Sequence, residues 1–130
     1  MIAVDASAVL AILLDEAEGP VFKATLLAAA GGVISPVNYW EVLVRAHTLR
    51  ADIGVAAAEA ALAGFAVQVA VMTAEDARVA AGAFIRFGKK TQARLNLGDC
   101  FAYALAAREG DGLLFKGDDF PKTDVKSALA

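Results

Sequence analysis

Residues 2–14 read IAVDASAVLAILL, and this stretch decides the fold. Its first four residues form a short apolar run that ends in the charge of Asp5, and the rest is rich in alanine and leucine. A short apolar run predicts a buried strand, and alanine and leucine favour a helix. The chain is therefore expected to begin with a strand that delivers an aspartate to the start of a helix.

Three more apolar runs follow: VIS at residues 33–35, VQVAVM at 67–72 and LLF at 113–115. Each is short, and two of them are rich in β-branched residues, so each predicts a strand. The segments between them are compatible with helices. Strands that alternate with helices indicate an α/β protein, with a mainly parallel central sheet of about four to five strands covered by helices on both faces.

Several residues predict where helices begin and end. Pro36 suits the first turn of a helix, Thr73 with an aspartate three residues later resembles a capping box, and Asn96 is a typical N-cap. Gly54 is expected to separate the helix over residues 37–50 from an alanine-rich helix that follows it.

Composition limits the class of protein. A chain of 130 residues with 58% hydrophobic residues fits one domain over residues 1–130. A formal net charge of −3 argues against a basic protein that coats nucleic acid, so any such contact is expected to be local. Cys100 is the only cysteine, which favours a reducing compartment and predicts the cytoplasm. The apolar stretch within residues 1–16 is too short to span a membrane, and no membrane association is expected.

Three aspartates are expected at one edge of the sheet. Asp5 ends the first strand, Asp99 lies in the opening turn of a helix, and Asp118 follows the last strand in FKGDDF, residues 115–120. Parallel sheets bind ligands beyond the carboxyl ends of their strands. Glu41 lies about one turn inside its helix and leans toward the same edge, because helical side chains point back toward the N-terminus.

Carboxylates that share a pocket repel one another unless a cation lies between them. Mg²⁺ suits an all-oxygen set of ligands, with Mn²⁺ as an alternative, and the sequence offers no histidine and thiol set for zinc. Such an ion supports hydrolysis of a phosphodiester.

Each acid also has an ordinary structural explanation. Asp5 could cap a helix, Glu41 could form an ion pair with Arg45 one turn later, and Asp99 could interact favourably with the dipole of its helix. The pair at residues 118–119 could form a turn. Their expected convergence at one sheet edge is what favours the metal pocket.

Four segments together are similar to a known family: VDASAV at 4–9, NYWE at 38–41, NLGDCFAYALA at 96–106 and LFKGDDF at 114–120. In order and spacing they resemble the signature blocks of PIN-domain ribonucleases, specifically VapC-type toxins. The resemblance covers nearly the whole chain. It implies a PIN-like three-layer α/β/α fold and a magnesium-dependent endoribonuclease, the toxin of a type II toxin–antitoxin module.

The resemblance also implies roles for single residues. The catalytic carboxylates would be those of Asp5, Glu41, Asp99 and Asp118. All but Glu41 would bind the metal directly, and Asp119 is the alternative to its neighbour Asp118. Ser7 and Asn96 match polar positions that orient carboxylates or water, although Asn96 is equally explained as a cap.

The segment before NLGD departs from the family, because relatives often carry a His-Pro-Ala stretch where this chain has KKTQARLN. Lys89, Lys90 and Arg94 are predicted to contact RNA phosphates without reading the base sequence. The alternative is a solvated basic loop.

The resemblance implies two protein partners. A ribonuclease in the cytoplasm would be toxic, so a cognate antitoxin is expected, and the protein is expected to be a homodimer. The apolar stretches AVLAILL and VFKATLLAAA are candidates for the surface that an antitoxin helix covers.

Rival functions fit the sequence less well. A catalytically silent PIN-fold interaction domain would not need all four acids. A receiver-like phosphoacceptor domain would have a lysine after its last strand, which Lys116 matches only in part. A haloacid-dehalogenase phosphatase would have an acid where this chain has Ser7. His47 is expected on another helix face than Glu41, and Cys100 is expected to be a small buried residue.

Overall fold

The computed structural model describes residues 1–129. Its elements are, in order, β1 (Ala3–Val4), α1 (Ala6–Leu13), α2 (Gly19–Ala29), β2 (Gly32–Ile34), α3 (Pro36–Gly64), β3 (Val67–Val69), α4 (Ala74–Phe87), α5 (Leu97–Glu109), β4 (Leu113–Leu114) and the 3-10 helix η1 (Phe120–Lys122). Each predicted strand is present; β1, β3 and β4 are shorter than the apolar runs that predicted them, and β2 begins one residue earlier than its run. No helix within this range is both long and apolar enough to cross a membrane.

The four strands form one sheet in the order β3-β2-β1-β4, and every pair is parallel. Ala3 of β1 is in register with Val33 of β2 on one side and with Leu113 of β4 on the other. The predicted α/β class with a parallel sheet is therefore confirmed, with four strands.

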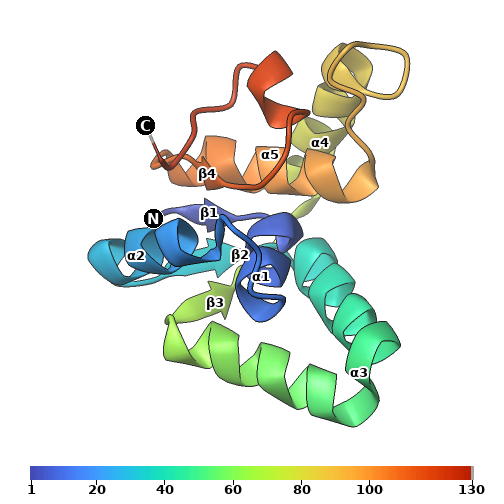
Figure 1. Ribbon diagram of the computed structural model, residues 1–130. Helices are drawn as coiled ribbons and strands as arrows, with labels where there is room; N and C mark the ends of the chain where they lie inside the picture. Colours follow the sequence, from blue (N-terminus) through green and yellow to red (C-terminus); the bar gives the residue numbers. More distant parts are fainter. Residues whose placement is uncertain (130) are drawn as a thin grey trace.

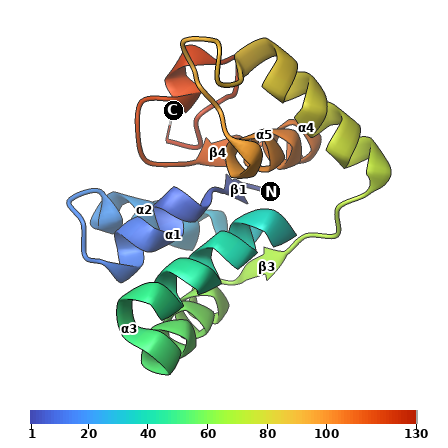
Figure 2. The same cartoon turned by 90° about the vertical axis from the view of Figure 1, so that its right-hand side faces the viewer.

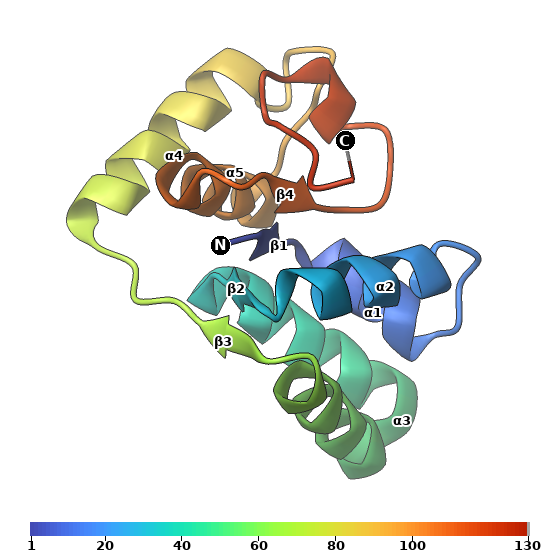
Figure 3. The same ribbon diagram turned by 90° about the vertical axis from the view of Figure 1, so that its left-hand side faces the viewer.

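Alternate residues of the strands face two separate cores. Val4, Ile34 and Leu114 pack with α1, α2 and α3 on one face. Their neighbours Ala3, Val33 and Leu113 pack with α4 and α5 on the other. Figure 2 shows these two helical layers on either side of β1, and Figure 3 shows the chain leaving β3 and crossing to the second layer through α4. The predicted three-layer arrangement is confirmed.

Helix α3 differs from its prediction, because Gly54 does not separate two helices. The helix is instead interrupted earlier, at Arg50 and Ala51, whose backbone angles are not helical, and its two halves meet at a sharp angle (Figure 1). A Cβ on Gly54 would lie 2.2 Å from the carbonyl oxygen of Ala46. The glycine therefore permits the close approach that the corner requires, three residues beyond the corner itself.

The helix starts follow the predicted signals. Pro36 lies in the first turn of α3, behind Ser35 as the N-cap. Thr73 and Asn96 cap α4 and α5 in complete capping boxes, with an aspartate closing each box in place of the usual glutamate or glutamine. These local hydrogen bonds set the residue at which each helix begins.

The strand order places a ligand crevice at the middle of the sheet. From β1 the chain proceeds outward to β2 and β3, and later returns to add β4 on the opposite side of β1. In parallel sheets the crevice lies where the strand order reverses, beyond the carboxyl ends of the strands. Here that position lies between β1 and β4, next to Asp5.

Candidate active site

Asp5 directly follows β1 and is the N-cap of α1. Its Oδ2 accepts hydrogen bonds from the Ser7 backbone N–H at 3.1 Å and from the Ser7 hydroxyl at 2.5 Å. The Ser7 oxygen in turn accepts from the backbone N–H of Lys116, beyond β4, at 3.0 Å. Ser7 therefore ties the ends of β1 and β4 together and orients the carboxylate between them.

Burial dominates the electrostatics of Asp5, whose side chain is only 5% exposed. The pKa of Asp5 is raised to about 6: burial is the largest cause, the bonds from Ser7 act in the opposite direction, and the charge of Glu41 acts in the same direction as burial. Capping of α1 explains one role of Asp5. It does not explain why the carboxylate of Glu41 lies close enough to affect the pKa of Asp5.

Glu41 lies in α3 and is held by Asn38, one turn earlier. The Asn38 side-chain amide donates to Glu41 Oε1 at 2.8 Å and to the carbonyl oxygen of Gly98, in α5, at 3.0 Å. Asn38 is fully buried and accepts from the Ser35 hydroxyl at 2.6 Å. Burial raises the pKa of Glu41, the bond from Asn38 lowers it, and the charge of Asp99 raises it. No ion pair joins Glu41 to Arg45 within residues 1–129, so the partner of Glu41 on its own helix is an amide.

Asp99 lies in the first turn of α5 and takes part in its capping box. Its Oδ2 accepts from the Asn96 backbone N–H at 3.0 Å, and its own N–H donates to Asn96 Oδ1 at 2.9 Å. Burial raises the pKa of Asp99 to about 6; the bond from Asn96 opposes this, and the charges of Asp5 and Asp119 add to it. Asn96 is thus both the cap of α5 and a fixed neighbour of the Asp99 carboxylate.

Three of the four predicted acids come together. Asp5, Glu41 and Asp99 line one hollow of about 480 Å³, together with Ser7 and the exposed Trp40. The charge of each raises the pKa of another member of the set. Three separate elements, α1, α3 and α5, therefore deliver carboxylates to one position at the predicted edge of the sheet.

The adjacent acids beyond β4 behave differently from each other. Asp118 and Asp119 are both exposed, and neither lines the hollow. The charge of Asp119 raises the pKa of Asp99, whereas Asp118 is not among the groups that do so. Of the pair, Asp119 is the one whose charge acts on Asp99.

The donor set suits a hard divalent cation. Within residues 1–129, no three histidine, cysteine or carboxylate side chains lie where they could hold a metal ion between them. Mg²⁺ is commonly held by one or two carboxylates and keeps several waters, so full ligation by protein is not required. Carboxylates whose pKa values are raised to about 6 by burial and mutual repulsion gain stability when a cation joins them. The residues present fit such an ion.

Sequence reasoning missed two residues that shape the site, Asn38 and Gly98. A Cβ on Gly98 would lie 2.2 Å from Glu41 Oε1, so only glycine leaves room for that carboxylate. The signal for Asn38 was present in the spacing of Ser35, Asn38 and Glu41, three residues apart along one helix face.

The basic loop lies together with a cation that the sequence did not single out. Lys89, Lys90 and Arg94 line a hollow of about 730 Å³. Lys122 of η1, which follows β4 in the sequence, lines the same hollow. All four side chains are exposed.

Cys100 and His47 have no place in the carboxylate hollow. Cys100 lies in α5 and is buried in the core, where burial raises its pKa to about 11, which makes the thiol a poor nucleophile. His47 is exposed on α3 and does not line the hollow. Both findings agree with the sequence expectation.

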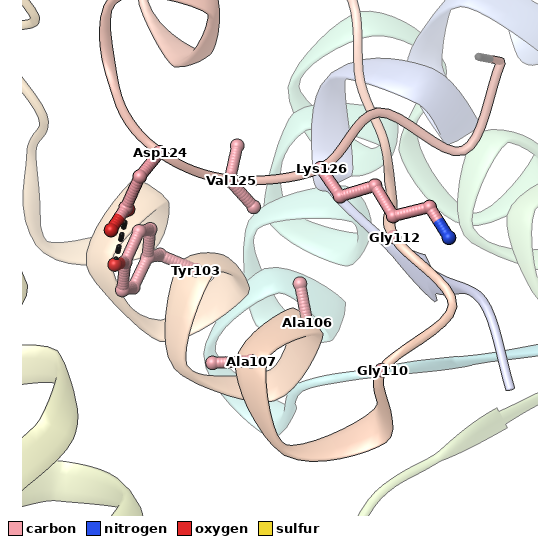
Figure 4. Close-up of a pocket in the computed structure, with 8 residues that line it drawn as sticks. All are labelled: Tyr103, Ala106, Ala107, Gly110, Gly112, Asp124, Val125 and Lys126. Carbon is pink, nitrogen blue, oxygen red and sulfur yellow. Dashed lines mark hydrogen bonds between the residues drawn. The ribbon is translucent and has the colours of Figure 1, made fainter.

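A further hollow, of about 290 Å³, lies between α5 and the C-terminal segment (Figure 4). Tyr103 donates a hydrogen bond to Asp124 Oδ1 at 2.5 Å on its wall. It shares no residue with the carboxylate hollow and contains one acid, so it offers no comparable metal site.

Comparisons with known proteins agree with this geometry. The model of the family described as PIN domain matches residues 2–126. Ribonuclease VapC42 of Mycobacterium tuberculosis is 38% identical over 128 residues, which cover 96% of this chain and 97% of that protein. Ribonuclease VapC30 of the same organism is 35% identical over 123 residues, 94% of each chain. The crystal structure of M. tuberculosis VapC20, described as a sarcin-ricin loop cleaving toxin, matches with a TM-score of 0.76 and 18% identity over 97% of both chains, which shows the shared fold.

Proposed function

Since the chain belongs to the PIN-domain family and, within it, to the VapC group, we propose that it is a metal-dependent endoribonuclease and the toxin of a type II toxin–antitoxin module. The observation that carries this proposal is the convergence of Asp5, Glu41 and Asp99 on one hollow at the switch point of the sheet. One domain over residues 1–130 would carry the activity.

Asp5 and Asp99 would hold Mg²⁺, or Mn²⁺ in its place, with Asp118 or its neighbour Asp119 as a further carboxylate. A bound divalent cation lowers the pKa of a coordinated water and stabilises charge on the oxygens of a phosphodiester. Ser7 and Asn96 would keep the two aspartates in position through the hydrogen bonds described above.

Glu41 would act on the attacking water. Its carboxylate lines the same hollow, and its raised pKa, caused chiefly by burial, makes it a better proton acceptor than an exposed glutamate. In the reaction, the water oxygen forms a bond to phosphorus and one of its protons passes to Glu41. The bond from phosphorus to the leaving ribose oxygen breaks, and that oxygen keeps the electron pair and takes a proton from solvent. Lys89, Lys90 and Arg94 would contact the phosphates of the RNA.

The experiment that tests this proposal is incubation of the purified protein with RNA in Mg²⁺ or in EDTA, beside Asp99→Asn. Asparagine keeps an oxygen that accepts from the Asn96 N–H, so the cap of α5 survives while the charge is lost. Cleavage is expected only for the wild type with Mg²⁺. Cleavage that persists in EDTA, or in a folded Asp99→Asn protein, would reject the metal site.

A cognate antitoxin would restrain this activity in the cytoplasm. Much of AVLAILL is buried, but Leu13, Leu14, Ala46 and Leu49 line an apolar hollow between α1 and α3. Leu10 lines both this hollow and the carboxylate hollow, so a helix bound in the first would end beside the second. Growth of the host on expression of the chain alone, compared with co-expression of the neighbouring gene, tests this: an active, folded chain that is harmless alone would contradict the toxin role.

We further propose a homodimer. Exposed Phe84, Ile85 and Leu97 surround an apolar hollow of about 470 Å³ between α4 and α5, which supports burial against a second copy. Light scattering should give twice the chain mass, and Ile85→Glu should give the monomer mass. A wild-type monomer at assay concentrations would reject the dimer.

A further inference from the structure

Four cations from two distant segments form one surface. Lys89, Lys90 and Arg94 come from the loop between α4 and α5, and Lys122 comes from η1; Thr91 and Gln92 complete the lining, and no carboxylate takes part. Figure 1 shows this loop and η1 on the same side of the molecule. We call these four residues the cationic surface.

The loop that carries three of these cations is anchored from beneath. Ala93 and Leu95 are buried in the core with α4 and α5. The Leu95 N–H donates to the Phe87 carbonyl at 2.8 Å, and the Thr91 N–H donates to the Gly88 carbonyl at 3.0 Å. The backbone is therefore fixed while the charged side chains project into solvent.

Lys122 is brought to the loop by a clamp on the C-terminal segment. Arg86 of α4 pairs with Asp124 at 2.7 Å, and Tyr103 of α5 donates to the same carboxylate (Figure 4). Arg86 lies just before the loop and Asp124 just after Lys122, so this clamp sets the two cationic segments side by side.

Nothing in the described residues neutralises the cationic surface. None of its four side chains takes part in an ion pair or a hydrogen bond within residues 1–129, whereas four other cations, Arg78, Arg86, Arg108 and Lys116, are paired with acids. Other cations in the described part of the chain are also unpaired, but here four of them line one hollow. Four neighbouring positive charges repel one another in a chain whose net charge is −3. The arrangement favours a ligand with several negative charges.

The segments that carry the cationic surface also carry residues of the candidate metal site. Arg94 lies two residues before Asn96, which caps α5 beside Asp99. Lys122 lies three residues after Asp119, in the segment that follows β4. A ligand that reached both places would offer one phosphate to a cation held by the carboxylates and further phosphates to the cationic surface, which is a property of an RNA strand.

We infer that the cationic surface binds the sugar–phosphate backbone of the substrate on one side of the cleaved bond, so that the substrate is an RNA with several nucleotides beyond the cut, and that Lys122 is part of this site. This inference rests on the proposed ribonuclease function. The site contributes to substrate binding without reading bases.

The test measures binding separately from cleavage. In the Asp99→Asn background with EDTA, fluorescence anisotropy of a labelled 20-nucleotide RNA is followed across a series of NaCl concentrations. The logarithm of affinity should fall with the logarithm of salt by about 0.7 for each phosphate contacted. Replacement of all four cations by alanine should therefore reduce the slope by about 2 to 3 and weaken binding at least about tenfold at low salt.

Two further variants sharpen the result. Lys122→Ala alone should reduce the slope by about 0.7 and, in the cleaving protein, raise KM with kcat unchanged. Lys23→Ala is the matched control, because Lys23 lies on α2 in the opposite helical layer and should change neither quantity. A 4-nucleotide RNA should bind the wild-type surface much more weakly than the 20-nucleotide RNA.

An unchanged salt slope in the fourfold variant overturns the inference, and so does equal affinity for the short and long RNA. The same titration with polyglutamate tests an acidic protein as the ligand. If the fourfold variant loses its binding of polyglutamate but keeps its affinity for RNA, the inference is overturned and the surface is assigned to an acidic protein. Failure of the inference and failure of the proposed function can be told apart. If the wild type cleaves RNA but the fourfold variant keeps the wild-type salt slope, only the inference is rejected. If the slope falls as expected but the wild type shows no Mg²⁺-dependent cleavage, RNA binding is supported and the ribonuclease function is rejected.

Discussion

The side-chain amide of Asn38 donates a hydrogen bond of 2.8 Å to the carboxylate of Glu41, one turn later on α3. The same amide group reaches the carbonyl oxygen of Gly98 on α5 at 3.0 Å. One fully buried side chain thus sets both the direction of Glu41 and the distance between the two helices that carry Glu41 and Asp99.

Asn38→Ala is expected to lower cleavage by about 10–100-fold, because Glu41 loses the donor that orients it. The free energy of unfolding should fall by about 1–3 kcal/mol, because the buried Gly98 carbonyl is left without its donor. Cleavage rates are measured well below the melting temperature of the variant, so that loss of fold does not contribute.

Glu41→Gln serves as the comparison for Asn38→Ala. Glutamine can still accept from Asn38, so the melting temperature should be unchanged or higher, while cleavage is lost with the charge. Full activity of a folded Asn38→Ala protein would contradict the positioning role.

Gly98→Ala should separate activity from stability. The new Cβ would lie 2.2 Å from Glu41 Oε1, at the flexible end of that side chain, so Glu41 can move aside without disturbing the backbone. Displacement of a catalytic group by about 1 Å can cost on the order of 100-fold in rate. We expect that loss in kcat/KM, with a melting temperature near that of the wild type.

The matched control for Gly98→Ala is Gly82→Ala, in the middle of α4. A Cβ there would meet nothing within 4 Å. Alanine should therefore stabilise the helix by up to about 1 kcal/mol and leave cleavage unchanged. Equal activity of the two variants would reject the steric role of Gly98.

The stability of the metal-free protein should depend on pH through Asp5. Burial raises the pKa of Asp5 from 3.8 to about 6, so the folded protein keeps this proton at pH values where the unfolded chain has lost it. Stability from this group is therefore fully present below about pH 4 and is lost as pH rises to about 6. At about 1.4 kcal/mol for each pH unit, the loss is roughly 2–3 kcal/mol.

Thermal melting in EDTA between pH 4 and pH 7 measures this loss. Asp5→Asn should make the curve less steep, because the variant has no proton to lose at this position; Asp99 and Glu41, whose pKa values are also raised, account for the pH dependence that remains. Asp52→Asn, at an exposed position on α3, should leave the curve as it is. If Asp5→Asn melts with the wild-type pH dependence, the raised pKa is wrong.

The two acids beyond β4 are predicted to differ in their effect on the metal. Of these two acids, only Asp119 has a charge that raises the pKa of Asp99, so Asp119→Asn should weaken Mg²⁺ binding more than Asp118→Asn does. Calorimetric titration of Mg²⁺ into each folded variant measures this directly. A larger effect of Asp118→Asn would instead place Asp118 at the metal, as the family resemblance implies.

Much of the fold was predictable because its determinants are local. The strand that ends in Asp5, the proline and asparagine that open α3 and α5, and the capping box at Thr73 each depend on a few consecutive residues. The exception is the corner in α3, which falls at Arg50 and Ala51 and not at Gly54. There the packing of the two helix halves overrides the local preference, since alanine is a strong helix former.

By itself, the sequence determined the alternation of strands and helices, the two-faced sheet and the edge at which acids gather, because periodicity and capping act over a few residues. Only the tertiary structure decided that Asn38 meets Gly98, 60 residues away, that Asp119 and not Asp118 acts on Asp99, and that Lys122 joins the loop at Lys89. Such contacts follow from how helices pack across the sheet, and short-range patterns carry no measure of that packing.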